Sequence, residues 1–146
     1  MARGQKLLRV EQYTIKSDTS PYNSDTAFRA GQPMIAHDGT TVKKVSSNAI
    51  RKIGFIVDDV NFTSGHVGKV VDLCYDGDIL VTVGAALAVG TEVNVSIATG
   101  KMEAIADEAV GDTFKWADGY LLEASGADGD KVLMRIAPRN YVSASI

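Results

Sequence analysis

The amino-acid sequence predicts an all-β protein: a small antiparallel β-barrel or β-tulip-like core with an extended N-terminal arm. Short apolar runs alternate with turn signals at close spacing from Gln32 onward, which is typical of antiparallel barrels and sandwiches. Residues 92–98 alternate apolar and polar side chains, as a half-buried strand does. Residues 85–90 and 106–111 resemble helix but are too short for more than one turn. Strands therefore dominate the prediction.

Length and composition indicate one globular domain. The chain has 146 residues, of which 45% are hydrophobic and 23% charged. No run approaches the roughly 20 apolar residues of a membrane helix, and the first residues lack the apolar stretch of a signal peptide. Cys74 is the single cysteine, which excludes an intrachain disulfide and a cysteine zinc cluster. We expect a protein that is used without export.

The charge is divided unevenly along the chain. Residues 1–52 hold nine Lys/Arg against four Asp/Glu, a net +5, and residues 53–146 hold six against fourteen, a net −8. A basic first part fits either a nucleic-acid partner or a segment that lies on an acidic protein surface. The basic residues are mostly spread singly, whereas capture of a phosphate backbone usually draws on a denser cluster. The acidic protein surface is the favoured interpretation.

Residues 1–32 are predicted to be the extended arm. They contain several turn-forming residues, and their apolar side chains follow no helical or strand period. Such a segment cannot form a core alone, so we expect it to be disordered or to become ordered on another surface. The isolated apolar residues favour the second alternative; they are Tyr13, Ile15, Tyr22 and Phe28.

Residues 33–146 are predicted to be the β-barrel domain. Strands are expected at residues 34–36, 41–45, 53–60, 66–75, 79–83, 92–98, 101–106 and 131–137. Three of the four Asp-Gly pairs, those that begin at Asp38, Asp76 and Asp128, are predicted to be turns. Within 92–98, the buried face is expected to carry Val93, Val95 and Ile97, and the polar face Glu92, Asn94 and Ser96.

Residues with catalytic or metal-binding chemistry are few. The histidines, His37 and His66, are expected to be a solvated loop residue and a residue at the start of a strand. Cys74 lies in an apolar run and is predicted to be a small buried hydrophobe. Trp116 is predicted to be a core or interface anchor. We expect no catalytic, cofactor or metal site and no enzymatic activity.

The order of features in residues 72–139 resembles the small β-rich capsid cement, or head decoration, proteins of tailed bacteriophages. The segments that carry this resemblance are VDLCYDGDILVTV, ALAVGTEVNV, TGKMEAI, GYLLEASGADGD and KVLMRIAPR. They correspond to a strand with a turn, a tight link into the next strand, a hairpin, a loop, and a terminal strand that ends in Pro-Arg.

The resemblance implies a non-enzymatic virion protein, made in the host cytoplasm, that lies on the capsid exterior. It would bridge neighbouring subunits of the major capsid protein, as a homotrimer, with no cofactor, membrane or direct nucleic-acid partner. On this basis we hypothesise that the capsid or subunit interface includes Tyr13, Ile15, Tyr22, Phe28 and Trp116.

Other function classes stay open. One is a different head or tail structural protein, such as the base of a head fibre. An oligonucleotide-binding β-barrel is less favoured, because the strand-rich part of the chain carries the −8 charge. A small enzyme or ligand-binding barrel would need convergent polar groups in a pocket, and the sequence shows none.

Overall fold

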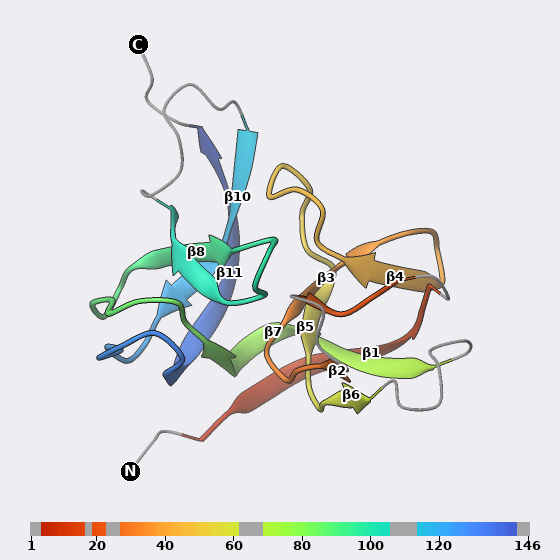
Figure 1. Ribbon diagram of the computed structural model, residues 1–146, viewed down its shortest axis with the longest axis horizontal. Coiled ribbons are helices and arrows are strands. Elements are labelled where there is room, and N and C mark those ends of the chain that lie inside the picture. The colour runs from red at the N-terminus through yellow and green to blue at the C-terminus, as the bar shows by residue number, and fades with distance from the viewer. Residues whose placement is uncertain (1–3, 17–18, 23–26, 62–68, 106–113, 143–146) are drawn as a thin grey trace.

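The computed structural model describes residues 4–16, 19–22, 27–61, 69–105 and 114–142, and none of them lies in an α-helix (Figure 1). The all-β prediction is confirmed. The strands are β1 (Lys6–Ile15), β2 (Ala27–Phe28), β3 (Pro33–Ala36), β4 (Thr41–Lys44), β5 (Gly54–Ile56), β6 (Val60–Asn61), β7 (Val70–Thr82), β8 (Glu92–Val95), β9 (Met102–Ala104), β10 (Phe114–Leu121) and β11 (Lys131–Val142). β2 and β6 pair separately, and the others form a nine-stranded sheet.

Five strands of this sheet form a closed ring of pairings, which we call the first ring. β1 pairs with β4 in parallel, β4 with β3 as an antiparallel hairpin, β3 with β5, and β5 with β7. β7 then pairs with β1 along most of its length, from Thr14 opposite Val70 to Lys6 opposite Asp78. The first ring therefore closes through β1.

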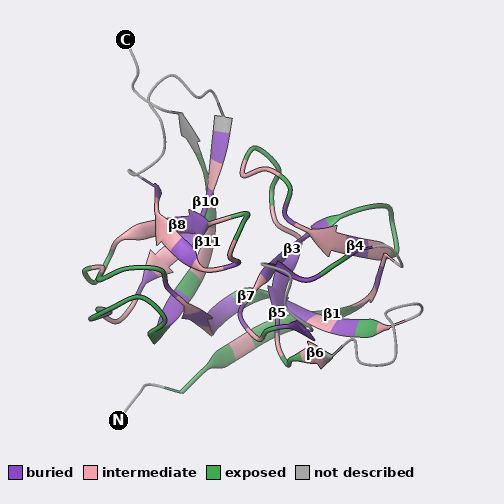
Figure 2. Ribbon diagram, viewed as in Figure 1, coloured by how far each residue is buried: buried purple, intermediate pink, exposed green. Residues whose placement is uncertain are grey.

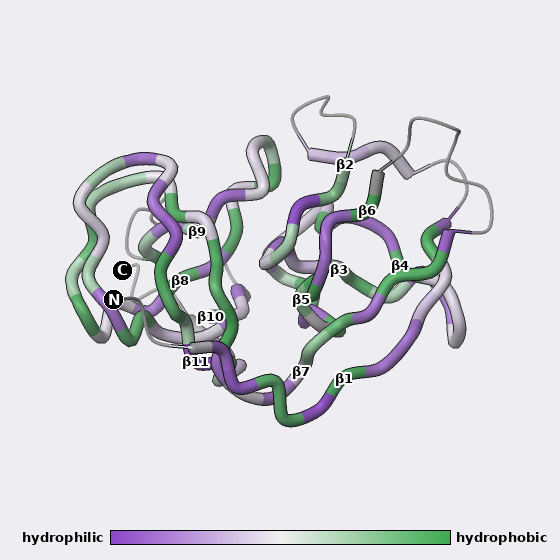
Figure 3. Tube along the Cα trace, turned by 90° about the horizontal axis from the view of Figure 1, so that it is seen from below, coloured by the Kyte–Doolittle hydropathy of each residue, from purple (hydrophilic) through white to green (hydrophobic). Residues whose placement is uncertain are grey.

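The far half of β7 belongs to a second ring. This half of β7 pairs with β11, and β11 pairs with β10. β10 in turn pairs with β8, and β8 pairs with β9. A bridge between Val83, just beyond β7, and Met102 of β9 returns the pairings to β7. Figure 3 shows the two rings side by side. Where the sequence predicts one barrel, the structure has two small rings that share β7.

One hydrophobic core runs through both rings (Figure 2). Its members in the first ring include Met34, Ile56 and Leu73, and those in the second include Val93 and Leu121. Because β7 contributes to both rings and their buried side chains form one cluster, the rings are expected to stabilise each other.

The predicted boundary at residue 32 does not separate two parts of the structure. The described part of residues 1–32 belongs to the first ring, since β1 closes it and β2 packs on it through the buried Phe28. The reason is hydrogen bonding: β1 satisfies backbone groups along one side of β7 that would otherwise lack a partner. Residues 6–15 are thus extended, as predicted, but they are a sheet strand.

Two of the three predicted Asp-Gly turns are confirmed. Asp38 lies in the turn between β3 and β4, and Asp128 in the turn before β11. The prediction of a turn at Asp76 is wrong. β7 continues through Asp76 and Gly77, so that the two strands expected at 66–75 and 79–83 form a single strand. Gly77 has a φ of 124°, and a Cβ there would come within 1.9 Å of the Lys6 carbonyl oxygen. The glycine serves the close approach of β1 rather than a turn.

The alternation predicted for residues 92–98 holds only in part. Val93 and Val95 are buried as expected, but Asn94 is buried as well. Ile97 is exposed, because β8 ends at Val95 and the chain turns at residues 97–99. The predicted solvent-facing side of β8 is therefore covered at Asn94 but only partly at Glu92.

Candidate interaction surface

A buried polar cluster joins the two rings. The β4–β5 loop, residues 45–53, brings Lys52 to Asp118 of β10, with Nζ and Oδ1 3.1 Å apart and the side chains only 3% and 2% exposed. In the same loop, the Asn48 side-chain amide donates to the Val95 carbonyl of β8, and the Trp116 amide of β10 donates to the Asn48 carbonyl, both at 2.7 Å. The Lys52–Asp118 pair is almost fully buried, whereas Asn48 and Trp116 are half-buried.

The carboxyl group of Asp118 lies in a strongly perturbed environment. Burial raises its pKa to about 6, and the Lys52 ammonium acts in the opposite direction. Its Oδ2 atom has no hydrogen-bond partner among the described residues. The adjacent cavity of about 20 Å³ is also lined by Tyr75, Ile136 and Pro138. This volume suits about one water molecule, not a substrate.

Three of the five predicted interface residues lie in the core of the first ring. Ile15, Tyr22 and Phe28 are buried, and the rings of Tyr22 and Phe28 pack edge to face at 5.9 Å. The Tyr22 hydroxyl donates to the Pro33 carbonyl at 2.7 Å and accepts from the Val45 amide at 2.9 Å. These side chains stabilise the chain itself. They are not on its surface, where the predicted arm would present them.

The other two predicted residues are partly exposed. Tyr13, near the end of β1, donates its hydroxyl to the Glu11 carboxylate at 3.2 Å, and partial burial raises its pKa. Trp116 on β10 lies beneath the Arg51 guanidinium, which is 5.4 Å from the ring centroid. They belong to different rings, and an interface role for either stays a prediction.

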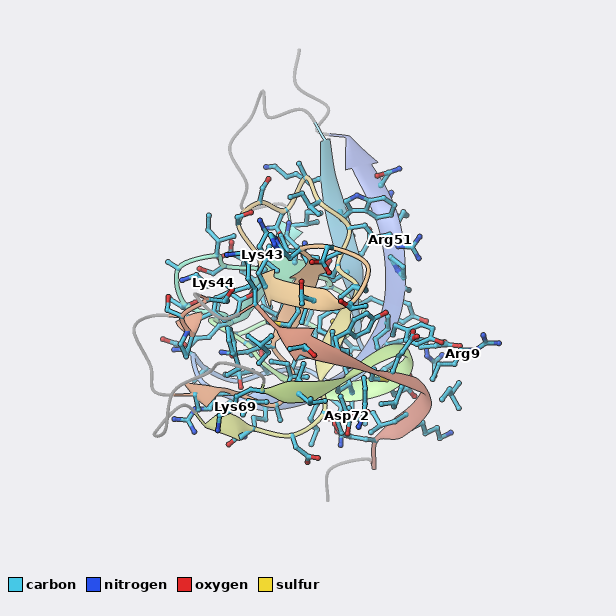
Figure 4. The ribbon with its side chains drawn as sticks, turned by 90° about the vertical axis from the view of Figure 1, so that its right-hand side faces the viewer. Arg9, Lys43, Lys44, Arg51, Lys69 and Asp72 are labelled. Carbon is cyan, nitrogen blue, oxygen red and sulfur yellow. The ribbon has the colours of Figure 1, made fainter. Side chains whose placement is uncertain are left out.

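Basic side chains of the first ring are spread over one face of the molecule. Figure 4 shows this face, on which the labelled residues are Arg9, Lys43, Lys44, Arg51, Lys69 and Asp72. They come from β1, β4, the β4–β5 loop and the start of β7. The basic character of residues 1–52 is the sequence signal that predicts this face, although the sequence does not show that Lys69 joins it.

Most of the large exposed apolar side chains in the described ranges also belong to this ring. Those on β1, β7 and the β4–β5 loop are Leu8, Val10, Ile50, Val70 and Tyr75. Val89 and Ile97 lie in loops of the second ring. The periodicity of the sequence does not identify this exposed set.

The structure adds no candidate for metal chemistry in the part of the chain that it describes. Within those ranges, no three His, Cys, Asp or Glu side chains are grouped so that they could hold a metal ion. His37 is exposed and Cys74 is buried, as predicted, whereas His66 lies outside the described residues. The described residues also include no helix that is long and apolar enough to cross a membrane.

The fold defines the chain as an all-β protein of two rings that share a strand. No protein-family model and no curated protein matches it. Among solved structures it is similar to the head fiber gp8.5 N base of bacteriophage phi29, with a TM-score of 0.52 and 16% sequence identity. The similarity covers 88% of this chain and 93% of that one. At this identity the likeness shows a shared fold.

Proposed function

We propose that this protein is a non-enzymatic structural component of a bacteriophage head. It binds the outer surface of the capsid and bridges neighbouring subunits of the major capsid protein. The fold likeness to a head fiber base carries the proposal, because it extends over nearly the whole of both chains. The resemblance of residues 72–139 to capsid cement proteins points to the same location.

The physical character of the molecule supports a binding role. The Lys52–Asp118 pair between the rings is almost fully buried, and most of the large exposed apolar side chains in the described ranges lie on the first ring. Binding to a symmetric particle sums many weak contacts without chemistry. Assembly as a homotrimer would add to this effect, since each trimer would reach several capsid subunits.

The base of a head fibre is a second candidate, favoured by the same solved structure. Both candidates attach to the head, but they differ in what attachment achieves. A cement protein resists the pressure of the packaged genome by bridging capsid subunits. A fibre base holds a further structure at the head surface.

Co-sedimentation tests the proposal. Purified protein is mixed with heads of the virus that encodes it, and the pellet is expected to contain a fixed number of copies per head. Light scattering of the free protein gives its mass, and a trimer is expected.

A cement protein raises the temperature at which filled heads release their DNA, whereas a fibre base leaves it unchanged. Protein that stays in the supernatant at all concentrations would contradict attachment to the head.

A further inference from the structure

The pairing between β1 and β7 is irregular at one place. The register shifts twice, between Leu7 and Arg9 and between Arg9 and Val10, while Arg9 pairs with Asp76. These shifts leave Leu8 on β1 and Tyr75 on β7 without a partner in the ladder. Both side chains are exposed, Leu8 at 69% and Tyr75 at 41%. β-bulges re-aim side chains, and these bulges direct two large apolar groups toward solvent.

The two side chains line two neighbouring hollows at the junction of the rings. Leu8 and Ile136 of β11 line a depression of about 490 Å³ over the middle of β7. Ile136 also lines the small neighbouring cavity, together with Tyr75 and Pro138. Ile136 therefore lies between the depression and the small cavity. We call Leu8, Tyr75, Ile136 and Pro138 the junction patch.

The junction patch has rigid support. Lys52 and Asp118, the buried pair that joins the rings, line the same cavity as Tyr75 and Ile136. The patch thus rests on strands of both rings and on a sealed ion pair. A surface that is already ordered loses little conformational entropy when a partner binds.

Charged groups of both signs surround the junction patch, with cations in excess. Lys6 and Arg135 line the larger depression, and Arg9 lies beside Leu8. The Arg135 guanidinium forms two hydrogen bonds with the buried Asp78 carboxylate, at 2.9 and 3.2 Å, yet its side chain is half exposed. Arg9 is 3.8 Å from Asp76, and both are exposed. Asp76 and Asp78 line the same depression, so the three cations outnumber the carboxylates by one. The excess positive charge, on Lys6, complements a negative partner.

We propose that the junction patch is the docking site for an acidic protein surface that presents apolar side chains within a rim of carboxylates. This proposal rests on the proposed function, in which that surface belongs to the major capsid protein. Leu8 and Tyr75 supply the apolar contact, and Lys6, Arg9 and Arg135 supply the complementary charge.

A double variant, Leu8→Ser with Tyr75→Ser, tests the apolar contact. Loss of central apolar contacts is expected to weaken binding to purified heads about tenfold or more. Both side chains are exposed, so circular dichroism and the melting temperature should remain those of the wild type. Val89→Ser with Ile97→Ser is the matched control, since these residues are 63% and 48% exposed on the second ring. The control is expected to bind as the wild type does.

Charge reversal tests the rim. Arg9→Glu is expected to weaken binding and to make it less sensitive to salt, because exposed charges are screened as ionic strength rises. Lys131→Glu, an exposed position at the start of β11, is the control and should have little effect.

The outcomes separate the two proposals. If the wild type binds heads and the Leu8→Ser/Tyr75→Ser variant binds equally well, the docking site is overturned while the proposed function stands. If the wild type itself does not bind heads, both fail. A variant that retains head binding but loses self-association would assign the patch to a second copy of the chain. Competition by double-stranded DNA would assign it to nucleic acid; either result overturns the docking site.

Discussion

Asp38 shows how a single exposed side chain can stabilise a hairpin. Its carboxylate accepts hydrogen bonds from the Thr40 and Thr41 amides, both at 2.9 Å, in the turn that joins β3 and β4. These bonds lower the pKa of Asp38 to about 2, from an ordinary value of 3.8. The ionised carboxylate of Asp38 is therefore more stable in the folded chain than in the unfolded chain.

Replacing Asp38 should affect stability in a pH-dependent way. At neutral pH, Asp38→Ala is expected to unfold at a lower urea concentration than the wild type. The gap should shrink as pH falls from about 3.8 toward about 2, because the wild-type carboxylate then becomes protonated and loses its advantage. Urea titrations over this range measure the effect. Asp38→Asn keeps an oxygen acceptor without the charge and serves as the control; a gap that does not vary with pH would contradict this account.

The Asp-Gly pairs show what local sequence can and cannot predict. The pairs at Asp38 and Asp128 form turns, as the dipeptide indicates, but the pair at Asp76 lies inside β7. The dipeptide indicates that the backbone can adopt a positive φ, as Gly77 does. Whether that freedom makes a turn or a bulge depends on the strand beside it, here β1, which comes from a distant part of the sequence.

Among the elements, the β4–β5 loop links the two rings through Lys52. The ion pair of Lys52 with Asp118 is almost fully buried, whereas that of Lys101 with Asp128, at 2.8 Å, is exposed. Breaking a buried pair leaves a charge without its partner in a region of low dielectric constant. An exposed pair contributes little, because water and salt screen it.

Lys52→Met is expected to destabilise the protein by about 3–5 kcal/mol. The double variant Lys52→Met/Asp118→Leu should recover most of this loss, because no uncompensated charge remains. Lys101→Met, the exposed control, should cost less than about 1 kcal/mol. Chemical denaturation measures all three. The structural role of the pair would be contradicted if Lys52→Met cost no more than Lys101→Met.

The whole molecule is built around β7. Its two halves belong to different rings, and the buried side chains of both rings form one core. Neither ring can close without this strand, so loss of one ring removes pairing and packing from the other. The structure therefore indicates one cooperative unit rather than two domains.

Cooperative unfolding can be tested with Trp116, the single tryptophan, which lies in the second ring. Met34→Ala removes a buried side chain from the first ring and should cost about 2–5 kcal/mol. We expect this variant to shift the Trp116 fluorescence transition and the circular dichroism transition by the same amount. Leu121→Ala, in the second ring, should likewise shift both transitions by the same amount. Separate transitions for the two probes would show that the rings unfold independently.

Sequence patterns are enough to predict the all-β class, the β3–β4 hairpin, the burial of Cys74 and the basic character of the first part of the chain. These features depend on local patterns: side-chain alternation, turn dipeptides and composition. The folded chain is needed to show that β1 closes the first ring, that Lys52 pairs with Asp118, and that Leu8 and Tyr75 are exposed. Each of these depends on which distant strands pair and in which register, and a strand's own residues do not reveal its partner.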